Sequence, residues 1–259
     1  CLKNYYITYA NHVANGGFVV GAGLAGRKPI YVVRYQGFQW YNAPMIVNYA
    51  SKSKEIWNIP CPVFVRSIAM EGGMGPVAGS SHHSLFQRMP GTKILSPMTP
   101  KEYEYAYEEF MKDDDVYYIS EHRRSYDNTE EFENILHDES DIVLFPISIT
   151  RFDAEEARKE LEKQGLKVSI IHQLWIKPFI FKEEWKRCLN NSKYGGIVLD
   201  DDYEQGVASS IAHRMMIDSN KKVYTMGLEH RTAGFHPDRD NLPPSPKQII
   251  NKVKEITNV

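Results

Sequence analysis

The feature that most constrains the fold of this chain is a repeated alternation of strand-like and helix-like segments. Apolar, β-branched runs occur at 30–35 (IYVVRY), 61–68 (CPVFVRSI) and 116–120 (VYYIS), and such near-continuous runs are typical of strands buried in a parallel sheet. Between them, residues 43–57 carry apolar side chains at helical spacing, and another helix is expected to begin at Pro100 with Thr99 as its N-cap. Parallel strands joined by helical crossovers predict an α/β fold.

The second half of the chain repeats this pattern. Strands are expected at 141–148, 166–174, 195–201 and 221–228, and helices at 153–165, 182–191, 206–217 and 246–256. Gly165 is a stop signal for the first of these helices. The acidic stretch 127–141 is typical of a surface connection. We therefore predict two domains in series, 1–130 and 140–259, each a mainly parallel sheet flanked by helices.

The composition excludes several classes of function. Lys and Arg number 31 against 33 Asp and Glu, a net charge of −2 without a basic block, so no nucleic-acid partner is expected. No apolar run reaches the roughly 18–20 residues of a membrane helix, so no membrane partner is expected either. Three distant cysteines (Cys1, Cys61 and Cys188) form no CxxC pair, which favours a reducing, cytoplasmic location. Because the sequence begins at Cys1 rather than Met, we expect residues upstream of it.

Two acidic triplets, 113–115 and 200–202, are candidate metal ligands because carboxylates cluster in them. The first follows a predicted helix and the second ends a predicted strand. Solvated turns explain both, so we predict no metal site on this chain. The loop 229–244 contributes His230 and His236, which we expect to be polar groups at the surface or at an interface.

Five segments fall in one characteristic order: GAGLAGRKPIYVV, GFQWYNAPMIVNYASKS, PVFVR, MPGTKILSPMTPKEYEYAYEEF and EHRRSY. Together they resemble the pyrimidine-binding domain of thiamine diphosphate enzymes of the transketolase superfamily. The second half, from DIVLFPISITRFDAEEARKELEKQG to GGIVLDDDYEQGVASSIAHRM, is similar to the C-terminal domain of that superfamily. Within it, the resemblance is greatest to the beta subunit of two-subunit 2-oxo-acid dehydrogenase decarboxylases.

The resemblance implies a shared cofactor site. This chain has no GDG…N motif, which in the superfamily holds Mg²⁺ and the diphosphate. The resemblance therefore implies that thiamine diphosphate lies at a subunit interface, with Mg²⁺ held by an alpha-like partner in an α2β2 heterotetramer. The implied reaction is cleavage or transfer at a C–C bond of a small-molecule substrate, either a 2-oxo acid or a ketose.

Two residues are implied to bind the pyrimidine. The family has a glutamate nine residues before the first glycine of the GAGLAG-like stretch, where it hydrogen-bonds a pyrimidine ring nitrogen; here that position is His12. His12 is a replacement donor, a sign that the usual chemistry has been lost, or a slip in the alignment, since no carboxylate follows before Glu55. Phe38 aligns with the aromatic residue on which the pyrimidine stacks, and its alternative role is as a core residue.

The stretch SSHHS (80–84) lies where the family places histidines that face the substrate and act as general acids or bases. The resemblance therefore makes His82 and His83 catalytic candidates. Counting back from Pro90 without gaps places the usual histidine at Ala78, so either residue serves only if the loop is rearranged. The alternative is that both are surface residues.

Three functions follow as hypotheses. The first is a beta-like subunit of a thiamine diphosphate-dependent decarboxylase or dehydrogenase. The second is a non-catalytic structural or regulatory homologue within a hetero-oligomer, because His12 stands in place of the activating glutamate. The third is half of a split transketolase, which differs from the first in its sugar phosphate substrate.

Overall fold

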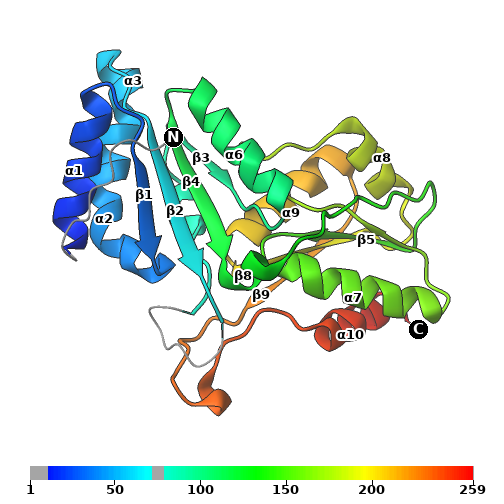
Figure 1. Cartoon of the computed structure of the whole chain (residues 1–259). Helices are drawn as coiled ribbons and strands as arrows, with labels where there is room; N and C mark the ends of the chain where they lie inside the picture. The colour runs from blue at the N-terminus through cyan, green and yellow to red at the C-terminus, as the bar shows by residue number, and fades with distance from the viewer. Residues whose placement is uncertain (1–10, 72–78, 259) are drawn as a thin grey trace.

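A computed structural model of the chain describes residues 11–71 and 79–258 (Figure 1). The first sheet has the strand order β1-β2-β4-β3-β7, and β1 to β4 are parallel. The second sheet has the order β6-β5-β8-β9 and is parallel throughout. These two sheets confirm the predicted α/β class. The strands are β1 (Ile30–Arg34), β2 (Val63–Ala69), β3 (Thr92–Leu95), β4 (Val116–His122), β5 (Ile142–Pro146), β6 (Val168–Ile170), β7 (Trp175–Lys177), β8 (Gly196–Tyr203) and β9 (Val223–Leu228).

Helices cover both faces of the first sheet. The helices α1 (His12–Leu24), α2 (Gln39–Met45) and α3 (Ser51–Trp57), with the π-helical turn η2 (Ile46–Ala50) between the last two, pack on one face through residues such as Val20 and Val47. On the other face, α6 (Pro100–Lys112) packs Ala106 and Phe110 against β2 and β4. The shorter elements are η1 (Gln36–Phe38), α5 (Ser84–Gln87) and η3 (Arg123–Asp127).

The second sheet is covered in the same way. Helices α7 (Thr150–Lys163) and α10 (Pro246–Thr257) pack on one face, where Leu161 and Val253 join a buried cluster. Helices α8 (Glu183–Asn191) and α9 (Val207–Ser219) cover the other face, and the short η4 (Pro237–Arg239) lies in the loop before α10. As predicted, α7 ends just before Gly165, which has a positive φ of 89°.

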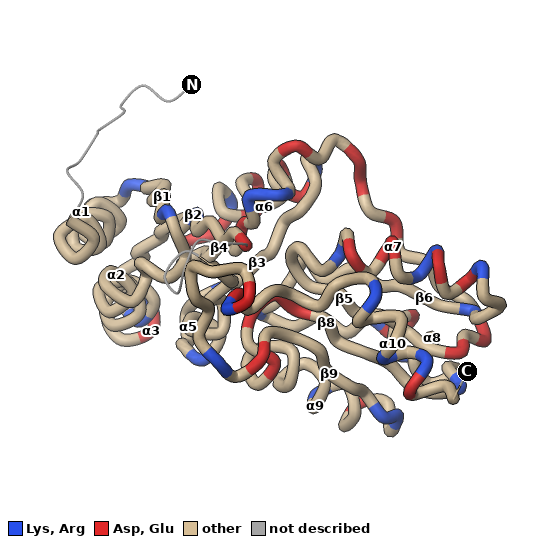
Figure 2. The backbone as a smooth tube through the Cα atoms, turned by 90° about the horizontal axis from the view of Figure 1, so that it is seen from below, with Lys and Arg blue, Asp and Glu red and all other residues tan. Residues whose placement is uncertain are grey.

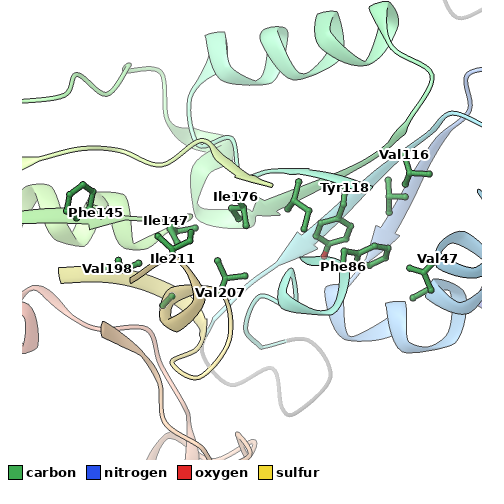
Figure 3. Packing of buried hydrophobic residues seen from close by; sticks show 14 of the residues in the cluster. Val47, Phe86, Val116, Tyr118, Phe145, Ile147, Ile176, Val198, Val207 and Ile211 are labelled. Carbon is green, nitrogen blue, oxygen red and sulfur yellow. The ribbon is translucent and has the colours of Figure 1, made fainter. Parts of the chain in front are cut away.

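One hydrophobic cluster runs through both halves of the chain. Figure 3 shows it extending from Val47 and Phe86, past Tyr118 and Ile176, to Phe145. All five side chains are less than about a tenth exposed, and burial of a side chain of this size contributes about 1.5–3 kcal/mol. The continuous core holds the two sheets in one arrangement, and this fixes the site that lies between them.

The strand expected over 166–174 differs from the one observed. β6 ends at Ile170, and the chain continues to β7, which pairs antiparallel with β3 of the first sheet. The second half therefore contributes an edge strand to the first sheet. A three-residue strand is too short for a periodicity argument to find, because its pairing depends on a partner distant in sequence.

Thr99 occupies the N-cap of α6, with Pro100 first in the helix, but its hydroxyl donates to Glu131 rather than capping the backbone.

Cys61 and Cys188 are buried free thiols, while Cys1 lies outside the described residues. Among the helices of the described segments, none is long and apolar enough to span a membrane.

Candidate functional site

His12 and Phe38 meet at the amino-terminal end of α1. The Asn11 side chain accepts a hydrogen bond from the Ala14 N–H and so caps the helix that begins at His12. The His12 and Phe38 rings are stacked, with centroids 4.8 Å apart and planes inclined by 6°. Tyr41 lies farther out, 6.3 Å from His12. The structure thus brings together the two residues that the resemblance assigned to the pyrimidine.

The turn that carries Phe38 is anchored by Gln36, which is fully buried. The Gln36 Nε2 donates to the Ser67 carbonyl (3.1 Å) and to Ser120 Oγ (2.9 Å). Its Oε1 accepts from the His82 backbone N–H at 2.6 Å. Gln36 therefore connects the Phe38 turn to the segment that carries His82 and His83. The sequence did not predict this connection, because an isolated glutamine belongs to no recognisable motif.

Two buried side-chain amides on α2 follow the turn that carries Phe38. Gln39 Nε2 donates to Tyr118 Oη (2.8 Å) and to Ser67 Oγ, and Asn42 Nδ2 donates to Tyr31 Oη (3.3 Å). Both residues are fully buried. Their carbonyl oxygens, Gln39 Oε1 and Asn42 Oδ1, have no hydrogen-bond partner in the described part of the chain. Such atoms are costly unless a ligand or water satisfies them.

His82 is the more accessible of the two adjacent histidines. Its side chain is partly buried, and Nε2 lies 3.4 Å from Ser80 Oγ. Burial lowers the pKa of His82, the Asp202 carboxylate opposes that effect, and His83 adds to it. A neutral, partly accessible imidazole of this kind can accept or donate a proton near neutral pH.

His83 is completely buried and makes two hydrogen bonds. Its Nδ1 lies 3.0 Å from Ser120 Oγ, and its Nε2 lies 3.0 Å from Asp200 Oδ2. Burial disfavours the charged form, but the Asp200 carboxylate outweighs it and raises the pKa of His83 to about 9. In this arrangement His83 joins the two halves of the chain and offers no free ring nitrogen to a substrate.

The prediction of a solvated turn at 200–202 is wrong. Asp200, Asp201 and Asp202 are 0%, 0% and 1% exposed, at the end of β8 where its pairing with β9 becomes irregular. Burial and the neighbouring Asp200 raise the pKa of Asp201 to about 7. The three carboxyl groups are shielded from solvent because residues 81–84 of the first half cover this end of β8.

The other acidic triplet stays at the surface, as expected. Asp113 pairs with Lys93, Asp115 with Lys54 at 3.1 Å, and Asp114 is half exposed. The loop histidines His230 and His236 are also exposed, and His236 Nδ1 accepts a weak bond from Asp238 N–H (3.3 Å) that caps η4. These groups lie outside the candidate site.

A comparison with sequence families decides what the first half of the chain is. Residues 13–129 match the family described as "Transketolase, pyrimidine binding domain". The chain carries a transketolase pyrimidine-binding domain. The matched range includes Phe38, His82 and His83, and His12 immediately precedes it.

The relatives of this chain include beta subunits. It is 24% identical over 220 residues to the 2-oxoisovalerate dehydrogenase subunit beta of Bacillus subtilis, which covers 77% of this chain and 65% of the relative. It is 25% identical over 179 residues to the acetoin:2,6-dichlorophenolindophenol oxidoreductase subunit beta of Cupriavidus necator, covering 62% and 52%. The matches therefore span less than two thirds of each relative's length.

Solved structures support the fold. A split gene transketolase, described as an inactive beta4 tetramer, superposes with a TM-score of 0.74 at 15% identity, over 98% of this chain and 83% of that chain. A transketolase mutant from Pichia stipitis superposes with a TM-score of 0.73 at 16% identity, over 95% of this chain and 37% of that chain. At these identities the likeness concerns architecture alone.

The donor set of the pyrimidine-binding domain fits an aminopyrimidine in part. Phe38 offers an aromatic surface, and the unpartnered Gln39 and Asn42 carbonyl oxygens are acceptors of the kind that an amino group requires. His12 offers ring nitrogens, but no Asp or Glu occurs before Glu55. The residues therefore fit the binding of thiamine diphosphate better than the activation that the family glutamate supplies.

Proposed function

We propose that this chain is the beta-like subunit of a two-subunit thiamine diphosphate enzyme that acts on a 2-oxo acid. The observation that carries the proposal is the stacking of His12 on Phe38, with ring centroids 4.8 Å apart, at the start of the segment that matches the transketolase pyrimidine-binding domain. The name of the 2-oxoisovalerate dehydrogenase relative supports a 2-oxo acid substrate, whereas the name of the other relative points to acetoin, a hydroxyketone. A ketose substrate is the third hypothesis, and the same site would serve it.

Each residue has a distinct part in this proposal. Thiamine diphosphate, when bound, supplies the carbon nucleophile that cleaves the bond next to a carbonyl. Phe38 stacks on the aminopyrimidine, a contact of about 0.5–1.5 kcal/mol beyond burial. His12 hydrogen-bonds a pyrimidine ring nitrogen. Of the two catalytic candidates we retain His82 as the acid–base group, because His83 is hydrogen-bonded to Ser120 and Asp200.

The surroundings of the site favour an alpha-like partner. Val13 and Phe18 on α1 are 55% and 60% exposed, and Trp40 and Tyr41 on α2 are 60% and 58% exposed. Figure 2 shows that α1 carries no Lys, Arg, Asp or Glu. An uncharged apolar patch of this size is typical of a protein interface. We propose that an alpha-like subunit covers it, brings Mg²⁺ and the diphosphate site, and completes an α2β2 assembly in the cytoplasm.

One observation favours the non-catalytic alternative. The imidazole of His12 already lies parallel to Phe38, so a pyrimidine must displace it from that face or use the opposite face of the ring. A chain whose His12 stays in place would complete an oligomer without binding the cofactor. The split gene transketolase with a similar fold is described as an inactive beta4 tetramer.

Activity of the two-subunit complex separates these possibilities. The chain is co-expressed with its candidate alpha-like partner, and reduction of 2,6-dichlorophenolindophenol is followed with 2-oxoisovalerate, acetoin and a ketose phosphate as substrates. Dye reduction that requires thiamine diphosphate, Mg²⁺ and both chains supports the proposal. A stable complex that reduces no dye and binds no thiamine diphosphate supports the non-catalytic alternative.

Substitution of His82 tests its part in the reaction. His82→Ala should lower kcat by about 10²-fold, the lower end of general acid–base effects, with little change in cofactor binding. His213→Ala is the matched control, because His213 is exposed on α9. An unchanged kcat in His82→Ala would remove His82 from the mechanism while leaving the cofactor site intact.

A further inference from the structure

The Asp triplet Asp200, Asp201 and Asp202 lies in the interior with one histidine. Asp200 Oδ2 is 3.0 Å from His83 Nε2, and Asp202 Oδ2 is 3.8 Å from the same nitrogen. Asp201 Oδ2 accepts from Ser81 Oγ at 2.7 Å. The carboxylates end β8 of the second sheet, and His83 belongs to the segment before α5 of the first half. The cluster therefore lies at the joint between the two halves.

The acidic groups of this cluster outnumber its one possible cationic partner. In the described part of the chain, no Lys or Arg forms an ion pair with any of the three carboxylates, and His83 is the one cationic partner. Three carboxyl groups and one imidazole therefore share a space of essentially zero exposure. Burying an unpaired charge costs several kcal/mol. A bound cation would remove that cost.

A second observation points into the same cluster. Asp201 is 0% exposed, and its Oδ1 has no hydrogen-bond partner among the described residues. The Ser148 hydroxyl lies near this carboxyl, but neither its oxygen nor Asp201 Oδ1 meets the geometry of a hydrogen bond. A buried carboxylate oxygen with a free lone pair is the group that a metal ion would satisfy.

The spacing of the donor atoms suits one ion. One nitrogen of His83 and one oxygen from each of Asp200 and Asp201 lie within 4.8 Å of one another. Donors bonded to a zinc-sized ion at about 2.0–2.2 Å lie no more than about 4.4 Å apart, so a shift of a few tenths of an ångström brings this set around one ion. The other ring nitrogen, Nδ1, lies 3.0 Å from Ser120 Oγ, and such a contact orients a histidine that ligates through Nε2.

We propose that His83, Asp200 and Asp201 bind a structural divalent cation that ties β8 to the segment before α5. One imidazole and two carboxylates are ligands for Zn²⁺ or Mn²⁺ rather than for a soft metal. The ion is separate from the Mg²⁺ of the proposed cofactor site and does not depend on it. Its place beside Ser120 connects it through Gln36 to the Phe38 turn.

The metal content of the purified protein tests this site. The full chain is produced in medium supplemented with Zn²⁺ and Mn²⁺, purified in metal-free buffer and denatured in guanidinium chloride, and the released metal is measured by mass spectrometry. About one divalent ion per chain is expected, as for a closed structural site. A folded wild-type protein that releases less than about a tenth of an ion per chain overturns the proposal, and His83–Asp200 is then a simple ion pair.

Variants identify the ligands. Asp201→Asn should reduce the metal content about tenfold or more, whereas Asp114→Asn, in the half-exposed triplet on the surface, should leave it unchanged. Equal metal in Asp201→Asn and wild type contradicts the assignment. If Asp201→Asn does not fold, Ser120→Ala takes its place, because it removes the partner of His83 Nδ1, together with one acceptor of Gln36, and leaves all three ligands intact. Its metal affinity, from chelator competition, should fall about ten- to hundredfold, and an unchanged affinity contradicts the site.

Discussion

The imidazole of His12 lies parallel to the ring of Phe38, with centroids 4.8 Å apart. Helix α1 and the turn after β1 supply these residues, and Gln36 holds that turn against the histidine pair. Since the resemblance aligns His12 with a carboxylic acid of the family, we propose that the pair combines the aromatic surface of Phe38 with an altered hydrogen-bonding group. Both halves of that statement can be tested by substitution.

Replacing His12 by the family residue should increase activity. In the proposed enzyme, the complex containing His12→Glu should turn over faster than wild type, by up to about 10²-fold, because a carboxylic acid shares its proton with a ring nitrogen more readily than a neutral imidazole. The measurement is kcat of dye reduction at saturating thiamine diphosphate. A complex that assembles normally but turns over more slowly than wild type would contradict the assignment of position 12.

The ion pair between Arg151 and Glu102 should stabilise the joint between the halves. Arg151 is fully buried at the start of α7, and its guanidinium donates two bonds of 2.7 and 2.6 Å to the Glu102 carboxylate on α6. Glu102→Gln leaves a buried cation without its partner, so the free energy of unfolding should fall by about 3–5 kcal/mol. Denaturant unfolding measures it, with the exposed Glu104→Gln on the same helix as control. Equal stability of the two variants contradicts the prediction.

Lys28 should stabilise the carboxyl end of α6. Its ammonium donates to the carbonyls of Phe110 (3.2 Å), Met111 (3.0 Å) and Asp113. The Phe110 carbonyl also accepts from the Asp113 N–H, and a cation at this helix end complements the helix dipole. Lys28→Met should lower the free energy of unfolding by about 1–2 kcal/mol, whereas the exposed Lys247→Met should change little. Thermal unfolding compares them, and a Lys28→Met protein as stable as the control would remove this role.

The stability of the fold should fall at acidic pH because of His122. Burial, with the nearby Arg124, lowers the pKa of His122 to about 3, whereas the unfolded chain titrates near about 6.5. Between these values the unfolded state binds more protons, so the free energy of unfolding decreases as pH falls from about 6.5 to about 3. Above that window His122 is neutral in both states and contributes no pH dependence.

His122→Asn tests this dependence, because an amide oxygen can replace Nδ1 as acceptor of the Arg124 N–H. The loss of stability between pH 6.5 and 4 should be smaller in the variant by about 1 kcal/mol per unit of pH. His213→Asn, at an exposed position, should retain the wild-type slope. If the free energy of unfolding changes with pH equally in the His122 variant and in wild type, another group controls the loss of stability at acidic pH.

The sheets could be predicted from the sequence because local pattern determines them. Apolar runs of five to eight residues identified β1, β2 and β4, and Gly165 and Pro100 marked helix ends. The edge strand β7 could not be predicted, because it has three residues and pairs with β3, which lies in the other half of the sequence. Register across such a distance is set by packing, which no local pattern records.

The candidate site was predictable only in part. Resemblance placed His12 and Phe38 at the cofactor, and the structure brings them together. It could not separate His82 from His83, since the difference lies in which ring turns toward Ser120 and Asp200. The burial of Asp201 was not predicted for a related reason. Three consecutive acidic residues predict a solvent-exposed segment, and the residues that cover them here are distant in sequence.

Binding of thiamine diphosphate to the two-subunit complex tests the central claim most directly. Calorimetric titration in the presence of Mg²⁺ should give saturable binding, which Phe38→Ala weakens by about three- to tenfold through the lost stacking. Phe235→Ala, 74% exposed in the C-terminal loop, should bind as wild type does. If the assembled complex binds no thiamine diphosphate, or binds it equally well without the Phe38 ring, the pyrimidine does not lie on this chain where we place it.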